Sequence, residues 1–115
     1  MKIRAKAARP APAVVFVTDY APVLANLNRS MAMNGLGDAL TRLDTDPGET
    51  DEAAMPASGL CVARLDWTDF TAEDAARLRP DVVFAADCVY AHDLFAPFAR
   101  TLGLLLDANP DCRIL

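Results

Sequence analysis

The sequence has little of what zinc-binding, disulfide-bonded or membrane-spanning proteins need. Its 115 residues include one histidine and three cysteines, without a CxxC pair. No apolar run approaches the roughly 20 residues of a membrane-spanning helix. Cys61, Cys88 and Cys112 each lie in an apolar segment. We therefore expect no metal site and buried, reduced thiols in an intracellular protein of the cytoplasm or nucleus.

Positive charge is scarce beyond the first nine residues, which hold four of the 11 basic side chains. Residues 13–115 carry the other seven bases and all 16 acids, a net charge of −9. Such a surface repels nucleic acid and attracts a basic protein. We expect a monomer with a protein partner, and neither a nucleic acid nor a membrane as partner.

Two stretches lack the periodicity of regular structure. Residues 1–12 are basic and rich in Ala and Pro, which predicts a disordered lead-in with a faint similarity to a transit peptide. Residues 36–58 mix Gly, Pro, Ser and Thr with six acids, which predicts a long acidic surface loop. Residues 13–115 are then expected to form one partial domain interrupted by that loop.

Short apolar strands alternate with helical patterns along this domain. The predicted strands cover residues 13–18, 60–65, 81–86 and 112–115, and the first is typical of a strand buried on both faces. The predicted helices lie between Pro22 and Asn34, between Thr71 and Pro80, and from about Asp93 to Asp107. Thr71 and Asp74 resemble a capping box. This alternation predicts an α/β fold with a mostly parallel sheet.

An acidic residue follows each of the first three predicted strands: Asp19, Asp66 and Asp87. In open parallel sheets, ligands bind beyond the carboxyl ends of the strands, so these acids predict a ligand site. A carboxylate such as that of Asp19 can accept hydrogen bonds from both hydroxyls of a ribose. The alternative is that Asp19 caps the helix that follows it.

The other two strand ends combine an acid with an aromatic side chain. Asp66 and Trp67 could bind a purine through the carboxylate and the ring face, or Trp67 could serve packing alone. Asp87 and Tyr90 lie three residues apart and can face one pocket if the chain turns there.

His92 is the only histidine and lies next to Asp93. No serine near it supports a Ser-His-Asp triad, and we expect a solvated residue at a helix start. A metal bound by Asp87, His92 and Asp93 would lack further ligands.

Taken together, the motifs resemble the seven-β-strand (class I) methyltransferases that depend on S-adenosylmethionine. Val17-Thr18-Asp19-Tyr20 is similar to their acidic second-strand segment, and Leu65-Asp66-Trp67 to their LDW element. Ala85-Ala86-Asp87-Cys88-Val89-Tyr90 is similar to the DxxY signature of the protein-lysine methyltransferases of methyltransferase family 16. The resemblance implies a Rossmann-like sheet, S-adenosyl-L-methionine as cofactor, and a lysine of a protein as methyl acceptor.

The resemblance also implies roles for individual residues. Asp19 would hold the ribose hydroxyls, and Asp66 and Trp67 would border the adenine. The implied cofactor-binding set is Asp19, Tyr20, Asp66, Trp67 and Ala86. Asp87 and Tyr90 would be the catalytic residues and would shape the entry of the lysine.

The chain departs from the family in one respect. The family has a first strand and a glycine-rich turn before the strand that ends at Asp19, whereas residues 1–12 contain no glycine. We expect the first and last strands of the fold to be missing, which would leave two strand edges unpaired. Two functions stay open: a protein-lysine methyltransferase whose 115-residue part is inactive alone, or a catalytically inactive fragment or protein-interaction module. A nucleotide-binding Rossmann domain of another class is a weaker third.

Overall fold

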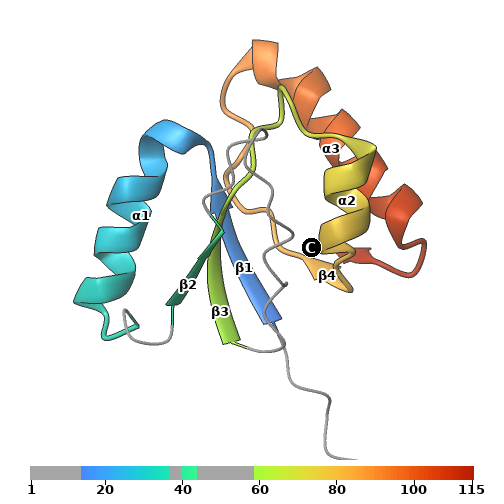
Figure 1. Ribbon diagram of the computed structural model, residues 1–115. Helices are drawn as coiled ribbons and strands as arrows, with labels where there is room; N and C mark the ends of the chain where they lie inside the picture. The colour runs from blue at the N-terminus through green and yellow to red at the C-terminus, as the bar shows by residue number, and fades with distance from the viewer. Residues whose placement is uncertain (1–13, 37–39, 44–58) are drawn as a thin grey trace, which may run out of the picture. The chain divides into compact units, whose positions relative to one another are not determined.

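The computed structural model describes residues 14–36, 40–43 and 59–115 (Figure 1). It divides the chain into two compact units, Met1–Leu65 and Asp66–Leu115. In both units the described strands pair in parallel, and each unit also contains at least one helix. The predicted α/β class is therefore confirmed as small parallel sheets with helices. The predicted lead-in, residues 1–12, lies outside the described residues.

The first unit contains a three-stranded parallel sheet in the order β1-β3-β2. Its strands are β1 (Val14–Asp19), β2 (Leu40–Leu43) and β3 (Gly59–Arg64). In the central strand β3, Cys61 and Val62 are fully buried, and Phe16 of β1 packs against Cys61. The expectation that the first strand is buried on both faces is wrong for Val15, which is 52% exposed. Side chains project from the faces of a sheet, so this exposure means that the described residues do not fully cover the face from which Val15 projects.

Strand β2 corrects the prediction that residues 36–58 form one irregular loop. Leu40–Leu43 pairs in parallel with β3, from Leu40 opposite Leu60 to Leu43 opposite Ala63. Four residues are too few to show a strand period in the sequence. Here the second edge of β3 offers the backbone donors and acceptors that make the segment a strand. Residues 37–39 and 44–58 of the predicted loop lie outside the described residues.

Helix α1 (Ala21–Met33) packs against β1 and β3 (Figure 1). Pro22 occupies its first turn, where a missing backbone N–H costs nothing. At the other end Gly35 adopts φ +74° and donates its N–H to Ala32 O (3.0 Å), and Leu36 donates to Met31 O (3.0 Å). This is a Schellman motif, so the predicted stop at Asn34-Gly35 is confirmed.

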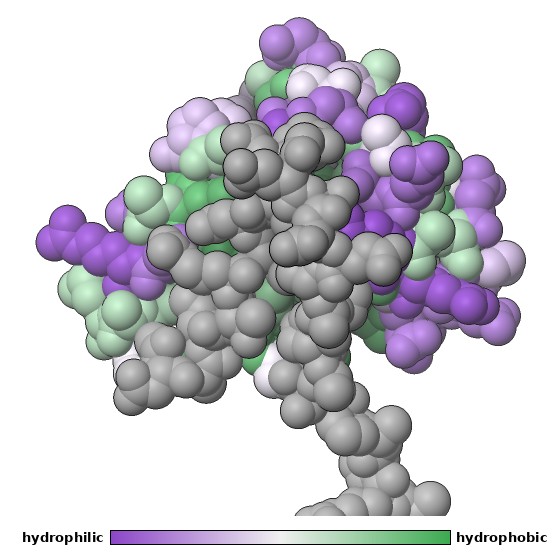
Figure 2. Space-filling model, viewed as in Figure 1, coloured by the Kyte–Doolittle hydropathy of each residue, from purple (hydrophilic) through white to green (hydrophobic). Residues whose placement is uncertain are grey.

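The second unit contains two helices and a two-stranded parallel sheet. Its elements are α2 (Ala72–Leu78), β4 (Val82–Val83), the 3-10 turn η2 (His92–Leu94), α3 (Phe95–Ala108) and β5 (Arg113–Ile114). Helices α2 and α3 pack side by side (Figure 1), with Ala75 and Leu105 buried. The opposite side of α2 is exposed, and the surface there is mostly hydrophilic (Figure 2).

A capping box begins α2, as the sequence predicts. Thr71 Oγ1 accepts a hydrogen bond from Asp74 N (3.2 Å), and Asp74 Oδ2 accepts one from Thr71 N (2.9 Å). The helix ends at Arg79, which adopts a left-handed conformation with φ +34°. Glycine favours this conformation and an arginine is strained in it, so the C-terminus of α2 stores some conformational energy.

Hydrogen bonds extend the pairing of β4 with β5 beyond the two assigned residues of each strand. Arg113 donates to Asp81 O (3.0 Å), Leu115 to Val83 O (2.9 Å), and Ala85 to Leu115 O (3.0 Å). The predicted strands 81–86 and 112–115 are thus confirmed in position. Phe84, however, is 79% exposed, which leaves an apolar side chain of this sheet in solvent.

The described strands form two separate sheets, which together account for five strands. Whether they belong to a seven-stranded sheet with missing members stays a prediction. Among the described residues, no helix is long and apolar enough to cross a membrane. The three thiols are free, with Cys61 and Cys112 buried as expected and Cys88 half-buried.

Candidate functional site

Asp19 lies at the carboxyl end of β1, next to the end of β3. The two strands run in register to Asp19 opposite Arg64, and Leu65 N donates to Asp19 O (2.9 Å). The Asp19 side chain is half-buried, and its Oδ1 accepts the N–H of Tyr20 (2.9 Å). The N-cap of α1 is Tyr20, whose side chain makes no capping hydrogen bond. The alternative in which Asp19 caps the helix is therefore wrong, because the N-cap position belongs to Tyr20 and the Asp19 carboxylate bonds the backbone N–H of that residue.

Asp66 organises a tight turn that ends at Phe70. Its Oδ1 accepts hydrogen bonds from Thr68 N (2.9 Å) and Thr68 Oγ1 (2.6 Å). Its carbonyl oxygen accepts hydrogen bonds from Asp69 N (3.2 Å) and Phe70 N (3.0 Å). One carboxylate oxygen of Asp66 thus already has two donors within the turn, which fixes the direction of the side chain.

Trp67 is half-buried and packs against Phe98 of α3. The two ring centroids are 4.6 Å apart and the rings are inclined at 53°, within the range of favourable aromatic pairs. The packing role for Trp67 is therefore present in the structure. Its predicted contact with adenine is untested and stays a prediction.

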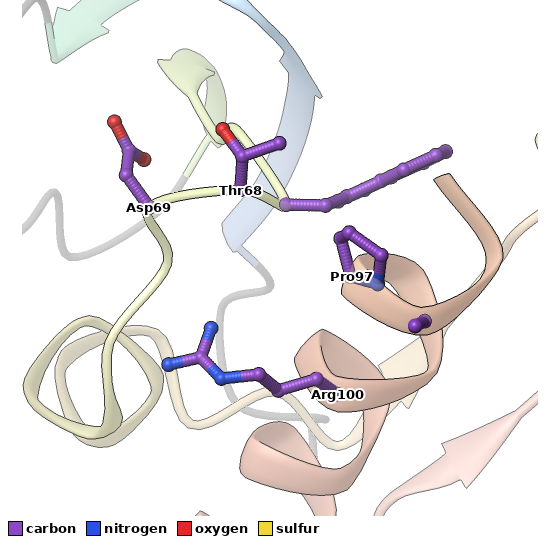
Figure 3. A pocket seen from close by; sticks show the side chains of 6 residues that line it. Thr68, Asp69, Pro97 and Arg100 are labelled. Carbon is purple, nitrogen blue, oxygen red and sulfur yellow. The ribbon is translucent and has the colours of Figure 1, made fainter. Parts of the chain in front are cut away.

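The turn that carries Trp67 is also joined to α3 by Arg100. Arg100 Nη1 donates a hydrogen bond to Phe70 O (2.8 Å), and the Phe70 side chain is 4% exposed. Figure 3 shows the Arg100 side chain extending from α3 toward the segment that follows Asp69. An open pocket of about 720 Å³ lies between the turn and the helix, lined by Trp67, Thr68, Asp69, Ala96, Pro97 and Arg100.

Asp87 lies where the chain leaves the sheet after β4, and it adopts φ +53°. A left-handed conformation is uncommon outside glycine, although Asp tolerates it better than most residues. Cys88 Sγ donates to Ala86 O (3.4 Å) across this turn. The chain therefore turns at Asp87, as the sequence argument required for Asp87 and Tyr90 to face one pocket.

Both residues of the DxxY pair are open to solvent. Asp87 is exposed and Tyr90 is 79% exposed. In the described part of the chain, neither side chain forms a hydrogen bond or an ion pair. Their convergence on a lysine stays a prediction.

His92 begins the turn η2 and is exposed, as expected for a residue at a helix start. Its ring lies 5.0 Å from that of Phe95. Within residues 14–36, 40–43 and 59–115, no three His, Cys, Asp or Glu side chains are grouped as a metal site would require. The alternative of a metal at Asp87, His92 and Asp93 thus has no support in the geometry.

The structure assigns the predicted residues to different units. Asp19 and Tyr20 belong to the first, whereas Asp66, Trp67, Ala86, Asp87 and Tyr90 belong to the second. The sequence alone did not predict that Arg100 lies beside the turn that begins at Asp66. A single cation among the mostly apolar side chains of α3 was the available signal, but spacing alone does not say which carbonyl it contacts.

Parallel strands and helices, with acidic residues at or after the ends of three of the strands, define a protein of the α/β class. Residues 3–115 match the model of the lysine methyltransferase family, and the chain belongs to that family. The resemblance drawn from the three motifs is thereby confirmed.

Two mammalian relatives carry the name protein-lysine N-methyltransferase EEF2KMT. The Bos taurus protein is 34% identical over 111 residues, which are 94% of this chain and 32% of that protein. The Mus musculus protein is 30% identical over 97 residues, 84% of this chain and 26% of that protein. The chain thus spans about a third or less of the relatives that it matches.

Proposed function

We propose that this chain is the part of an S-adenosylmethionine-dependent protein-lysine methyltransferase that binds the nucleoside end of the cofactor and receives the lysine. The observation that carries the proposal is the pairing of β1 with β3, which end together at Asp19 and Arg64. The family match and the names of the two relatives support methyl transfer to protein lysine.

The geometry at Asp19 fits a ribose. Oδ1 is held by the N–H of Tyr20 (2.9 Å), which fixes the side chain. Within the described part of the chain Asp19 Oδ2 makes no hydrogen bond, so it can accept one from a ribose hydroxyl. A charged acceptor forms the stronger kind of hydrogen bond, and a carboxylate held in place loses little entropy when it does so.

The turn that begins at Asp66 fits an adenine less completely. Asp66 Oδ1 is occupied by Thr68, and Trp67 packs against Phe98. Trp67 nevertheless lines the open pocket, where part of its indole can contact a flat ring. We propose that this turn borders the adenine, with Trp67 as the apolar contact.

When bound, S-adenosylmethionine supplies an electrophilic methyl group on its sulfonium sulfur. The protein has to bring a neutral amine in line with that group and exclude water around it. Asp87 is suited to orient the amine through its carboxylate and to accept its proton. Tyr90, 79% exposed, is suited to contact the alkyl part of an incoming lysine.

The proposal is tested by transfer of radiolabel from methyl-labelled S-adenosylmethionine to the proteins of a cell lysate. The full-length protein should label lysate proteins, and hydrolysis should release the label as methyllysine. Lysate whose amines were first acetylated is the matched control and should accept no label. Label in any other amino acid, or equal label after acetylation, would refute lysine methylation.

A second candidate is a non-catalytic module that keeps the fold of the family without binding the cofactor. It is favoured by the Asp66–Phe70 turn, in which Thr68 already bonds Asp66 Oδ1 and Trp67 already packs against Phe98. Calorimetric titration of the 115-residue chain with S-adenosylmethionine separates the two candidates. Binding tighter than about 100 μM, corresponding to roughly −5 kcal/mol, would exclude the non-binding module.

A further inference from the structure

We infer that Arg100 is a positioning residue for the cofactor. It acts by holding the Asp66–Phe70 turn against α3. The inference rests on the proposed function, since it gives the turn a ligand, but its structural part can be tested without any ligand. Arg100 lies outside the three motifs that resemble the family.

The turn is connected to α3 at two points. Trp67 packs against Phe98 with 4.6 Å between ring centroids, and Phe70 O accepts a hydrogen bond from Arg100 Nη1 at 2.8 Å. Phe98 and Arg100 are two residues apart on one helix, so α3 contacts the turn near its beginning and at its end. Without the hydrogen bond from Arg100, the contact between Trp67 and Phe98 would hold the turn near its beginning but not at Phe70.

The hydrogen bond to Arg100 also meets a need of the backbone. The N–H groups of Asp69 and Phe70 both donate to Asp66 O. The carbonyl oxygen of Phe70, in contrast, precedes the N-cap residue Thr71 and accepts no hydrogen bond from the backbone of α2. A carbonyl beside a buried side chain is costly to leave without a donor. A guanidinium is a strong donor with a fixed geometry, and it satisfies this carbonyl from a neighbouring helix.

The consequence for function follows from the position of Trp67. A turn that is fixed before the cofactor arrives has less conformational entropy to lose on binding. Release of the Phe70 anchor should therefore weaken cofactor affinity and leave the transfer step unchanged once the cofactor is bound. The same helix follows η2 directly, so the DxxY segment leads into the helix that holds the turn.

The experiment uses the full-length protein labelled with 5-fluorotryptophan, with the Trp67 resonance assigned by its loss in W67F. Fluorine NMR then reports on the turn without a ligand. In R100M, which keeps the aliphatic length and removes the donors, the Trp67 resonance should shift toward that of the free amino acid. R100K keeps one donor group and should shift less. R77M, which removes an exposed arginine of α2, is the matched control and should leave the resonance unchanged.

Cofactor binding is measured on the same proteins by calorimetry and by steady-state kinetics. We expect the Kd for S-adenosylmethionine to rise about three- to tenfold in R100M, the factor that corresponds to the net contribution of one typical intramolecular hydrogen bond. R100K should restore part of the affinity, and kcat at saturating cofactor should stay within about twofold of wild type. Far-UV circular dichroism confirms folding, and if R100M is unfolded the comparison is made with R100K.

An unchanged Trp67 resonance in a folded R100M protein would refute the anchoring role. A shifted resonance with unchanged Kd would refute the role in cofactor binding. Failure of the wild-type protein to bind S-adenosylmethionine would overturn the proposed function and the cofactor role together, and it would still leave the fluorine result to decide whether Arg100 holds the turn.

Discussion

Leu65 donates its backbone N–H to the carbonyl oxygen of Asp19 across a distance of 2.9 Å. This bond continues the parallel ladder of β1 and β3 one residue beyond the strand ends. It joins the last residue of one strand to the residue that directly precedes Asp66. The hydrogen bond therefore holds the backbone of Asp19 beside Leu65, the last residue of the first unit.

The Asp19 carboxylate should be the main determinant of affinity for the ribose. In D19A both its charge and the acceptor for Tyr20 N–H are lost, and we expect the Kd for S-adenosylmethionine to rise about 10- to 100-fold. D19N keeps an oxygen for the Tyr20 N–H and should lose less. D107A, which removes an exposed acid at the end of α3, is the control for net charge and should bind like wild type. Equal affinities in D19A and D107A, measured by calorimetry, would remove Asp19 from the site.

The sequence predicted the elements whose signals are local. Gly35 and Asn34 end α1, and the Thr71–Asp74 capping box begins α2, because caps and stops depend on residues a few positions apart. Strand β2 was missed because its four residues become a strand only through the edge of β3. Local pattern contains no information about a partner strand some 20 residues away.

The candidate site, too, has features that local sequence predicts and features that depend on distant contacts. The three motifs identified the family because each one lies at a strand end in the expected order. The contact between Arg100 and Phe70 spans 30 positions and involves a backbone carbonyl, so residue types alone could not predict it. The exposure of Phe84 likewise depends on which parts of the chain pack on the face of its sheet, and that is a property of the whole fold.

The capping box should stabilise α2 through two reciprocal hydrogen bonds. T71A and D74A should each lower the free energy of unfolding by about 1 kcal/mol. Because the two side chains bond each other's backbone, the double variant should cost less than the sum of the two. T71S keeps the hydroxyl and should unfold like wild type. Urea unfolding measures all four, and an additive double variant would contradict the reciprocal bonding.

Substitution of Asn109 should destabilise the second unit more than substitution of its other polar residues. It is 9% exposed, and its Nδ2 donates to Pro80 O (2.9 Å) while its Oδ1 accepts from Asp111 N (3.2 Å). N109A should lower the free energy of unfolding by about 2–3 kcal/mol, since it leaves partly buried groups without partners.

Hydrogen exchange localises this effect. The amides of Arg113 and Leu115, which pair β5 with β4, should exchange faster in N109A than in wild type. The exposed Asp111 provides the control: D111N keeps the backbone N–H that bonds Asn109 and should change neither stability nor exchange. Unchanged protection of Arg113 and Leu115 in N109A would show that the hydrogen bonds of Asn109 to Pro80 and Asp111 do not stabilise the pairing of β4 with β5.

Asp87 combines a strained backbone with a proposed catalytic carboxylate, and substitutions can separate the two. Its φ of +53° suits Asn and Gly and opposes a β-branched side chain. D87V should lower the free energy of unfolding by about 1–3 kcal/mol, whereas D87N and D87G should unfold at or above the urea concentration of wild type. If the carboxylate orients the amine or accepts its proton, D87N and D87G should both reduce kcat by about 100-fold or more while binding S-adenosylmethionine normally.

Arg79 provides the matched control because it is the other non-glycine residue with positive φ in the described part of the chain, and it lies outside the proposed site. R79G should raise the free energy of unfolding by about 1 kcal/mol through relief of the same kind of strain, with kcat unchanged. A loss of kcat in R79G equal to that in D87G would mean that backbone strain, and not the Asp87 carboxylate, controls the rate. Full activity in D87N would show that the charge at this position is dispensable and that the conformation of the turn is what the reaction requires.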